Sequence, residues 1–377
     1  MTPSTRGVKR ERPAPLLEGL RTHFHTDEGT VKAVDGVSFE VSRGETVCLV
    51  GESGSGKTVA CESITKLVPS PPGEIVDGRI TFDGDDLATR PPSQLSDVRG
   101  GRIAHVFQNP QGALDPVYSV GAQIVETIQF HDDASDAAAR TRAVDLLERV
   151  GIPEAASRFD EYPHEFSGGM KQRVVIAMAL AGEPDLLIAD EPTTALDVTT
   201  QAGILDLLND LKSEREMAIL FVTHDLGVVA EIADRVVVLY AGKVMERGGV
   251  HAIFETPAHP YTQALFRCLP GRGDRETIGG SFPDPTDPPD GCRFHPRCPH
   301  AIEACAEGDQ PPLEPVDPDH TASCIFHGEG YDAAAVYEGA ASATRSNAGR
   351  TESSRSDDRP DAAGRTDGGQ SVTEDHR

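Results

Sequence analysis

The chain has 377 residues, of which 38% are hydrophobic, 25% are charged and only 5% are aromatic. This length is enough for one large domain or two ordinary ones with a sizeable buried core. The longest apolar run, Val174–Ala181, is far shorter than the roughly 18 residues of a membrane-spanning helix. The basic N-terminus is not followed by the apolar segment of a secretory signal. We therefore expect neither an integral membrane protein nor a secreted one.

The charge is strongly acidic, with 61 Asp and Glu against 35 Lys and Arg, a net charge of −26. Such a surface argues against coating a nucleic acid, so no nucleic-acid partner is expected. Of the 35 bases, 28 are arginine. Molar salt shortens the Debye length to about 3 Å and screens the repulsion between carboxylates. We interpret the pattern as that of a halophile's cytosolic protein, with an ordinary acidic protein as the alternative.

Composition divides the chain into four parts. We expect residues 1–15 to be disordered. Residues 16–269 alternate apolar strand-like runs with helical patterns, which predicts an α/β domain with a largely parallel sheet. Residues 270–328 form a small, loop-rich, cysteine-containing extension, and residues 329–377 a disordered acidic tail. The predicted strands are Thr46–Val50, Leu186–Ala189, Ala218–Val222 and Val236–Tyr240, and the predicted helices include Asp136–Val150 and Thr199–Lys212.

A glycine-rich loop directly after the strand Thr46–Val50 is the sharpest motif. Its residues are Gly51, Glu52, Ser53, Gly54, Ser55, Gly56, Lys57 and Thr58. Glycines let the backbone N–H groups of such a loop surround phosphates, and the helix that follows adds its positive end. We expect Lys57 to reach the β- and γ-phosphates and the Thr58 hydroxyl to bind Mg²⁺. The loop therefore predicts a nucleotide site.

Two carboxylates, Asp190 and Glu191, follow the buried strand Leu186–Ala189. We expect Asp190 to hold Mg²⁺, directly or through water. Glu191 would orient and polarise the water that attacks the γ-phosphate.

A second candidate phosphate cradle begins at Ser167. It comprises Ser167, Gly168, Gly169, Met170, Lys171 and Gln172, followed by a helical pattern. A Gly-Gly pair at a helix N-terminus binds anions by the same dipole and N–H argument. Two cradles for one nucleotide site predict a two-fold dimer in which each second cradle closes over the partner's γ-phosphate.

With these motifs the sequence resembles the ATP-binding subunits of ABC transporters, whose signature motif looks like Ser167–Gln172. The resemblance implies a phosphate-loop fold with a helical subdomain at about residues 96–180. It also implies that Gln108 senses the metal and contacts the membrane partner. Asp197 resembles the loop residue that crosses the dimer interface, and His224 the histidine at the γ-phosphate. Phe24 is the candidate for stacking on adenine, with a buried strand residue as the alternative.

Three further segments resemble the dipeptide/oligopeptide importer branch of this family: Tyr162–Phe166, Ala189–Thr199 and His259–Thr262. This branch also has a C-terminal extension similar to Gly291–Pro299. The resemblance implies an ATPase on the cytoplasmic side of the cell membrane. Its implied partners are two permease subunits, a second ATPase subunit (identical or related) and an extracellular substrate-binding protein. Importers of nickel or other metal complexes, or of sugars, remain alternatives. A soluble ABC ATPase in DNA repair or translation is more remote.

The extension contains four cysteines, Cys292, Cys298, Cys305 and Cys324. Their spacing is not that of common zinc ribbons, so it does not identify a metal. Four thiolates suit either Zn²⁺ or an iron–sulfur cluster, and an unligated set is the third interpretation. Some members of the resembled branch carry a [4Fe–4S] cluster here, and the resemblance favours that interpretation.

Overall fold

An eight-stranded sheet forms the centre of the protein, in the strand order β11-β12-β10-β9-β3-β8-β7-β6. The computed structural model describes residues 16–108, 110–194, 196–268 and 278–337. The expected disorder of residues 1–15, and most of the predicted tail, lie outside these residues. The strands are β3 (Thr46–Val50), β6 (Ile103–Val106), β7 (Leu186–Asp190), β8 (Ala218–Val222), β9 (Arg235–Tyr240), β10 (Lys243–Gly249), β11 (Glu314–Asp317) and β12 (His320–Ala322).

Strands β9, β3, β8, β7 and β6 run parallel to one another. Every residue of β3, β7 and β8 is buried. Strands covered on both faces are expected to be continuously apolar, which is why the sequence placed these strands within a residue of their observed bounds. The prediction of a largely parallel sheet holds only for this centre, because β10, β12 and β11 pair antiparallel at one edge.

A separate four-stranded sheet has the order β2-β1-β4-β5 and is antiparallel throughout. Its strands are β1 (Leu17–Thr26), β2 (Gly29–Phe39), β4 (Gly73–Phe82) and β5 (Asp85–Asp86). Apolar side chains of β1, β2 and β4 pack with those of β3 and of helix α1 (Lys57–Ile64) in one buried cluster. This packing fixes the antiparallel sheet against the base of the glycine-rich loop.

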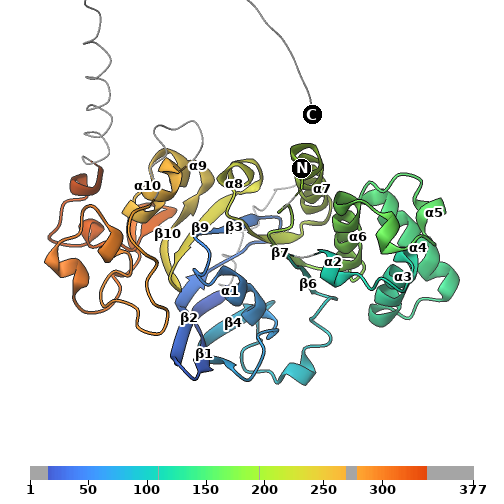
Figure 1. Cartoon of the computed structure of the whole chain (residues 1–377), viewed down its shortest axis with the longest axis horizontal. Coiled ribbons are helices and arrows are strands. Elements are labelled where there is room, and N and C mark those ends of the chain that lie inside the picture. Colours follow the sequence, from blue (N-terminus) through green and yellow to red (C-terminus); the bar gives the residue numbers. More distant parts are fainter. Residues whose placement is uncertain (1–15, 109, 195, 269–277, 338–377) are drawn as a thin grey trace, which may run out of the picture. The chain divides into compact units, whose positions relative to one another are not determined.

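A group of helices separates β6 from β7 in the chain (Figure 1). They are α2 (Pro110–Ala113), α3 (Val120–His131), α4 (Asp136–Arg149), α5 (Ala155–Arg158) and α6 (Gly168–Leu180). Side-chain caps start three of them: Ser119, Ser135 and Ser167 accept hydrogen bonds from the backbone of α3, α4 and α6. None of the helices in the described part of the chain is long and apolar enough to cross a membrane.

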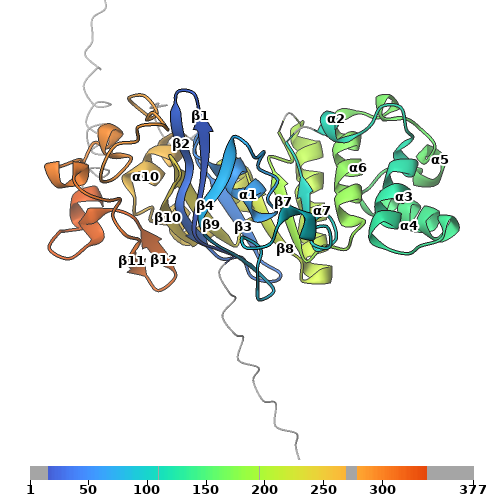
Figure 2. The ribbon, with the colours of Figure 1, turned by 90° about the horizontal axis from the view of Figure 1, so that it is seen from below.

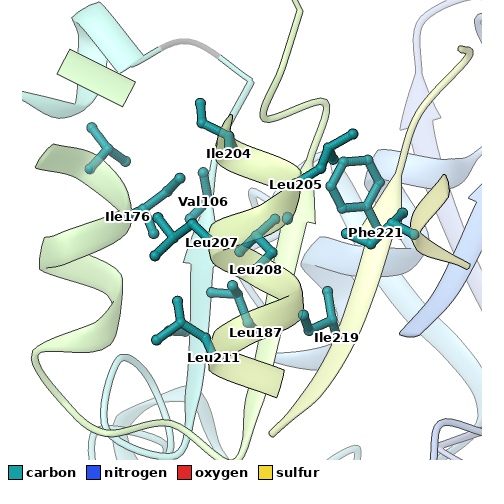
Figure 3. Packing of buried hydrophobic residues seen from close by; sticks show 14 of the residues in the cluster. Val106, Ile176, Leu187, Ile204, Leu205, Leu207, Leu208, Leu211, Ile219 and Phe221 are labelled. Carbon is teal, nitrogen blue, oxygen red and sulfur yellow. The ribbon is translucent and has the colours of Figure 1, made fainter. Parts of the chain in front are cut away.

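The remaining helices are α7 (Val198–Arg215), α8 (Leu226–Ile232), α9 (Val250–Glu255) and α10 (Pro260–Arg267). Helix α7 packs its apolar face on β7, β8 and α6 (Figure 3). Ile204, Leu208 and Leu211 on this face are at most 1% exposed. This contact joins the helical group to the central sheet.

The C-terminal segment, residues 278–336, is continuous with the central sheet. Its strand β12 pairs with β10, and β11 pairs with β12 (Figure 2). Phe294 and Ala322 of this segment are fully buried. The sequence predicted a loop-rich extension, and most of the segment is irregular, but its two short strands extend the edge of the sheet.

Candidate functional site

The glycine-rich loop, residues 51–58, joins β3 to α1 and has a backbone that only glycine accommodates at two positions. Gly51 and Gly56 have φ angles of +152° and +99°. A Cβ atom at Gly51 would lie 2.1 Å from the Leu239 carbonyl oxygen, and one at Gly56 would lie 2.2 Å from that of Ala33. The loop is therefore held close against neighbouring backbone at these two glycines.

Lys57 bends back over this loop. Its Nζ donates to the carbonyl oxygens of Gly51 and Glu52, at 2.8 and 2.9 Å, and lies 3.3 Å from Ser55 Oγ. Burial lowers the pKa of Lys57, and the neighbouring carboxylates of Glu191 and Asp190 oppose that shift. The ammonium group is thus placed beside the loop, where an arriving phosphate oxygen can replace the carbonyls as its partner.

Three side chains hold the carboxylate of Glu191. Gln108 Nε2 and Thr194 Oγ1 donate to Oε2 at 2.8 and 3.0 Å, and His224 Nδ1 lies 3.0 Å from Oε1. Burial alone would raise the pKa of Glu191, but these hydrogen bonds outweigh it and hold the pKa below its ordinary value. Glu191 is therefore ionised, and an ionised carboxylate only accepts, so His224 Nδ1 carries the shared proton.

Asp190 lies at the end of β7, 8% exposed, and hydrogen-bonds with the side chain of Thr58. Burial raises its pKa above the ordinary value, and the negative charge of Glu191 adds to that effect. A buried carboxylate beside a hydroxyl is an oxygen-only donor pair, which fits a hard divalent cation such as Mg²⁺.

Lys57, Thr58, Gln108, Glu191 and His224 line one cavity of about 810 Å³, and Asp190 is not among its lining residues. The loop residues Ser53–Thr58 form one wall together with Gln108, Glu191 and His224. Phe24, the candidate for stacking on adenine, lines it as well, together with Val31 and Ala33 of β2. The sequence did not predict a further set of lining residues, which the C-terminal segment contributes: Phe282, Pro285, Pro288 and Arg293.

The second predicted cradle lies elsewhere. Ser167 caps α6, accepting from the Met170 N–H at 3.3 Å, with Gly168 and Gly169 in the first turn and Gln172 buried one turn further on. Asp197 caps α7 through Thr200, and a Cβ at Gly169 would lie 2.4 Å from Thr200 Cγ2. The two helix N-termini are thus neighbours. Neither Ser167 nor Asp197 lines the cavity at the glycine-rich loop.

The four cysteines of the C-terminal segment line a small cavity of about 10 Å³ together with His259. Burial raises the pKa of Cys292 to about 11 and those of Cys298 and Cys324 to about 12. Among the residues that the structure describes, no group of three or more His, Cys, Asp or Glu is arranged to hold a metal ion. The structure therefore brings the predicted thiols together but carries no independent sign of a metal.

A phosphate-binding loop after a buried parallel strand, with paired carboxylates at the end of a neighbouring strand, defines a phosphate-loop nucleotide hydrolase. Comparison with known proteins narrows the class. Residues 34–194 match the ABC transporter family. Residues 245–305 match the C-terminal region of oligopeptide/dipeptide transporters. The chain belongs to the ATP-binding proteins of ABC transporters, in their oligopeptide/dipeptide branch, and its reaction is ATP hydrolysis.

Individual relatives extend over most of the chain. The oligopeptide transport ATP-binding protein OppD of Bacillus subtilis is 48% identical over 323 residues, covering 84% of this chain and 90% of that protein. The dipeptide transport ATP-binding protein DppD of Escherichia coli is 46% identical over 314 residues, covering 82% and 95%. A dimeric post-hydrolysis ATP-binding cassette with bound ADP and Pi has a TM-score of 0.57 at 28% identity, covering 63% of this chain and 99% of that one. The expected fold class is confirmed.

Proposed function

We propose that the chain is the ATP-hydrolysing subunit of a membrane importer of dipeptides or oligopeptides. The observation that carries this proposal is the match to the oligopeptide/dipeptide C-terminal region at residues 245–305. The two peptide-transport relatives add support, because their similarity extends over 84% and 82% of this chain. Energy from ATP would be coupled to the movement of peptide through partner subunits.

We infer the roles of the site residues from their positions. The loop amides and Lys57 bind the phosphates of ATP, and Phe24 stacks on the adenine. Glu191 accepts a proton from the attacking water, and its low pKa keeps it ionised and ready to do so. His224 and Gln108 fix both oxygens of that carboxylate, and each also reaches the cavity in which the γ-phosphate would lie.

Thr58, Gln108 and Asp190 would hold Mg²⁺ in this proposal. The hydrogen bond between Thr58 and the buried Asp190 supports the assignment, since both offer oxygen ligands at the same end of the loop. When bound, the ion neutralises negative charge on the phosphates.

The second cradle implies a second ATPase chain, identical or related. Ser167, Gly168, Gly169 and Asp197 lie apart from the cavity at neighbouring helix N-termini, with Gln172 buried one turn further along α6. We propose that they close over the nucleotide of the partner chain. The dimeric state of the cassette solved with ADP and Pi is consistent with this arrangement. Closing and opening of the dimer would drive the permease between its two orientations.

Two permease subunits and an extracellular binding protein complete the proposed importer, with this chain as a peripheral protein on the cytoplasmic face of the cell membrane. The acidic, lysine-poor composition leads us to propose a host whose cytosol holds high salt.

The four cysteines would hold an iron–sulfur cluster, with Zn²⁺ as the alternative ligand. All four cysteines line one small cavity, with Cys292, Cys305 and Cys324 buried and Cys298 partly buried, and this supports a group that takes four thiolates. A bound cluster would cross-link a segment that has little regular structure. Anaerobically purified protein should then contain stoichiometric iron and absorb broadly in the visible range. Colourless, iron-free protein with an ordered C-terminal segment would contradict the cluster.

The transport proposal is tested by affinity capture of the Glu191→Gln chain with ATP from detergent-solubilised membranes at high salt. We expect two multi-span permeases to co-purify, and reconstituted complex with its binding protein to take up labelled peptide. Uptake of a nickel complex or a sugar instead of peptide would show that the importer's substrate is not a peptide. Recovery of soluble partners alone would overturn the proposed role in transport but would leave the ATPase activity unaffected.

A further inference from the structure

The C-terminal segment contributes residues to the lining of the nucleotide cavity. Pro285 accepts a backbone hydrogen bond from Lys32 of β2 at 3.1 Å, and both residues line the cavity. A Cβ at Gly54 would lie 3.8 Å from Phe282 Cε1, so the Phe282 ring lies beside Gly54 of the glycine-rich loop. Figures 1 and 2 both place this part of the chain, drawn in orange, beside β2.

Glu52, the second residue of the loop, is the point at which this segment holds it most firmly. The guanidinium of Arg297 binds its carboxylate through both oxygens, at 2.8 and 3.2 Å. Arg297 also donates to the hydroxyl of Tyr240 at 3.0 Å. The Arg297 side chain is only 6% exposed and that of Glu52 is 24% exposed, so salt screens this pair less than a surface pair.

The backbone of Glu52 is fixed as well. Its N–H donates to the Tyr261 hydroxyl at 2.9 Å, and its carbonyl oxygen accepts from Lys57 Nζ at 2.9 Å. One loop residue is thus held at its N–H, its carbonyl and its side chain. The Arg297 contact spans 245 positions of sequence, so it is a product of the tertiary fold.

We propose that Arg297 is a positioning residue of the ATP site, which holds the phosphate loop in its nucleotide-binding form through Glu52. Two physical effects act in the same direction. A loop that is ordered before ATP arrives loses less conformational freedom on binding. The guanidinium also neutralises a carboxylate that would otherwise repel the phosphates. The C-terminal segment is therefore a working part of the nucleotide site.

This role predicts a specific kinetic change. Arg297 binds Glu52 and not the catalytic base Glu191. Removing its guanidinium should therefore weaken the binding of ATP and of the transition state by the same factor. In Arg297→Gln, we expect the dissociation constant and KM for ATP to rise about fivefold to tenfold, with kcat within about twofold of wild type. Arg297→Lys keeps the charge but not the two-pronged geometry, and should restore part of the affinity.

A double-mutant cycle separates this role from a general loss of stability. The variants are Arg297→Gln, Glu52→Gln and the double substitution, with ATP binding and thermal unfolding measured for each in the full-length chain. Because Arg297 acts through Glu52, the double variant should bind ATP no more weakly than Arg297→Gln. The control is Arg43→Gln, which removes an exposed pair with Asp185 at 3.3 Å and should leave ATP affinity unchanged.

Unchanged ATP affinity in a folded Arg297→Gln protein would overturn the proposal. Effects of Arg297→Gln and Glu52→Gln on binding that simply add would overturn it too, because the two residues would then act separately. If Arg297→Gln does not fold, the ATP affinities of Arg297→Lys and Glu52→Gln are compared with that of wild type instead. Wild-type affinity in both variants would refute the positioning role.

Discussion

His224 and Glu191 face each other with 3.0 Å between Nδ1 and Oε1, although 33 positions separate them in the chain. Glu191 has a φ angle of +47°, a backbone conformation that residues other than glycine rarely adopt. Its backbone N–H donates to the Val222 carbonyl at 2.9 Å, which ties this strained residue to the end of β8. Strain held in place by surrounding contacts is typical of a residue whose direction matters for function.

Glu191→Gln tests the base directly. The amide cannot take a proton, but it keeps the size of the side chain and can still hydrogen-bond with its neighbours. We expect ATP binding to persist while hydrolysis falls about 100-fold to 10,000-fold, the usual range for a lost general base. Bound, uncleaved ATP should also increase the dimeric fraction in size-exclusion chromatography.

The matched control is Glu231→Gln, an exposed glutamate on α8. This variant should hydrolyse ATP at the wild-type rate. Near-normal turnover in Glu191→Gln would show that another group accepts the proton.

Lys57→Ala should abolish tight nucleotide binding. The ammonium now bonds to the loop carbonyls, and in the complex its positive charge would bond to phosphate instead. One or two charge-assisted hydrogen bonds are lost, about 3 kcal/mol, so the dissociation constant should rise roughly 100-fold. Isothermal titration with ATP measures this loss directly, and wild-type affinity in the variant would contradict a phosphate-binding role.

Acid should destabilise the fold through His105. Burial, reinforced by the positive charge of Arg99, lowers the pKa of this imidazole to about 4, and its Nε2 hydrogen-bonds with Thr65 Oγ1 at 2.8 Å. The unfolded chain, with a pKa of about 6.5, takes up a proton first. The stability that His105 contributes is therefore complete above about pH 6.5 and is lost as the pH falls toward about 4.

The loss amounts to roughly 2 kcal/mol of unfolding free energy between about pH 7 and about pH 5. Denaturant unfolding at both pH values should give a smaller loss for His105→Gln than for wild type. The exposed His251→Gln serves as the control and should behave as wild type. Equal acid losses in wild type and His105→Gln would mean that His105 does not titrate as a buried neutral group.

Sequence patterns predicted the centre of the fold well and its edge poorly. Strands β3, β7 and β8 are buried on both faces, so a short apolar run marks each of them. In contrast, β11 contains Pro315 and β12 has only 3 residues, so neither carries a strand signal of its own. The pairing of β12 with β10, and of β11 with β12, depends on the rest of the fold, which no local pattern records.

The site divides in the same way. The glycine-rich loop, Glu191 and its neighbours stand in short motifs, and the structure places Lys57, Gln108, Glu191 and His224 around one cavity. Arg297 stands in the recognised segment Gly291–Pro299, but nothing in that segment indicates its partner, because Glu52 is 245 positions away and the pair exists only once the C-terminal segment has folded back. Charge and spacing in the sequence could not have identified it.

Salt should stabilise this protein strongly. A net charge of −26 makes the folded chain repel itself, and molar salt shortens the range of that repulsion to about 3 Å. We expect the Tm to rise by roughly 10 °C from low salt to molar KCl, equivalent to a few kcal/mol for a domain of this size. Differential scanning calorimetry over a KCl series measures it.

Salt also strengthens hydrophobic burial in many proteins, so the rise in Tm alone does not identify its cause. A variant with six exposed carboxylates changed to amides separates the two effects, at Asp133, Asp145, Glu148, Asp206, Asp210 and Glu231. If charge repulsion dominates, this variant should be more stable than wild type at low salt, and its Tm should depend less on KCl. If both proteins respond equally, salt acts on apolar surface, and the acidic composition is not an adaptation to molar salt.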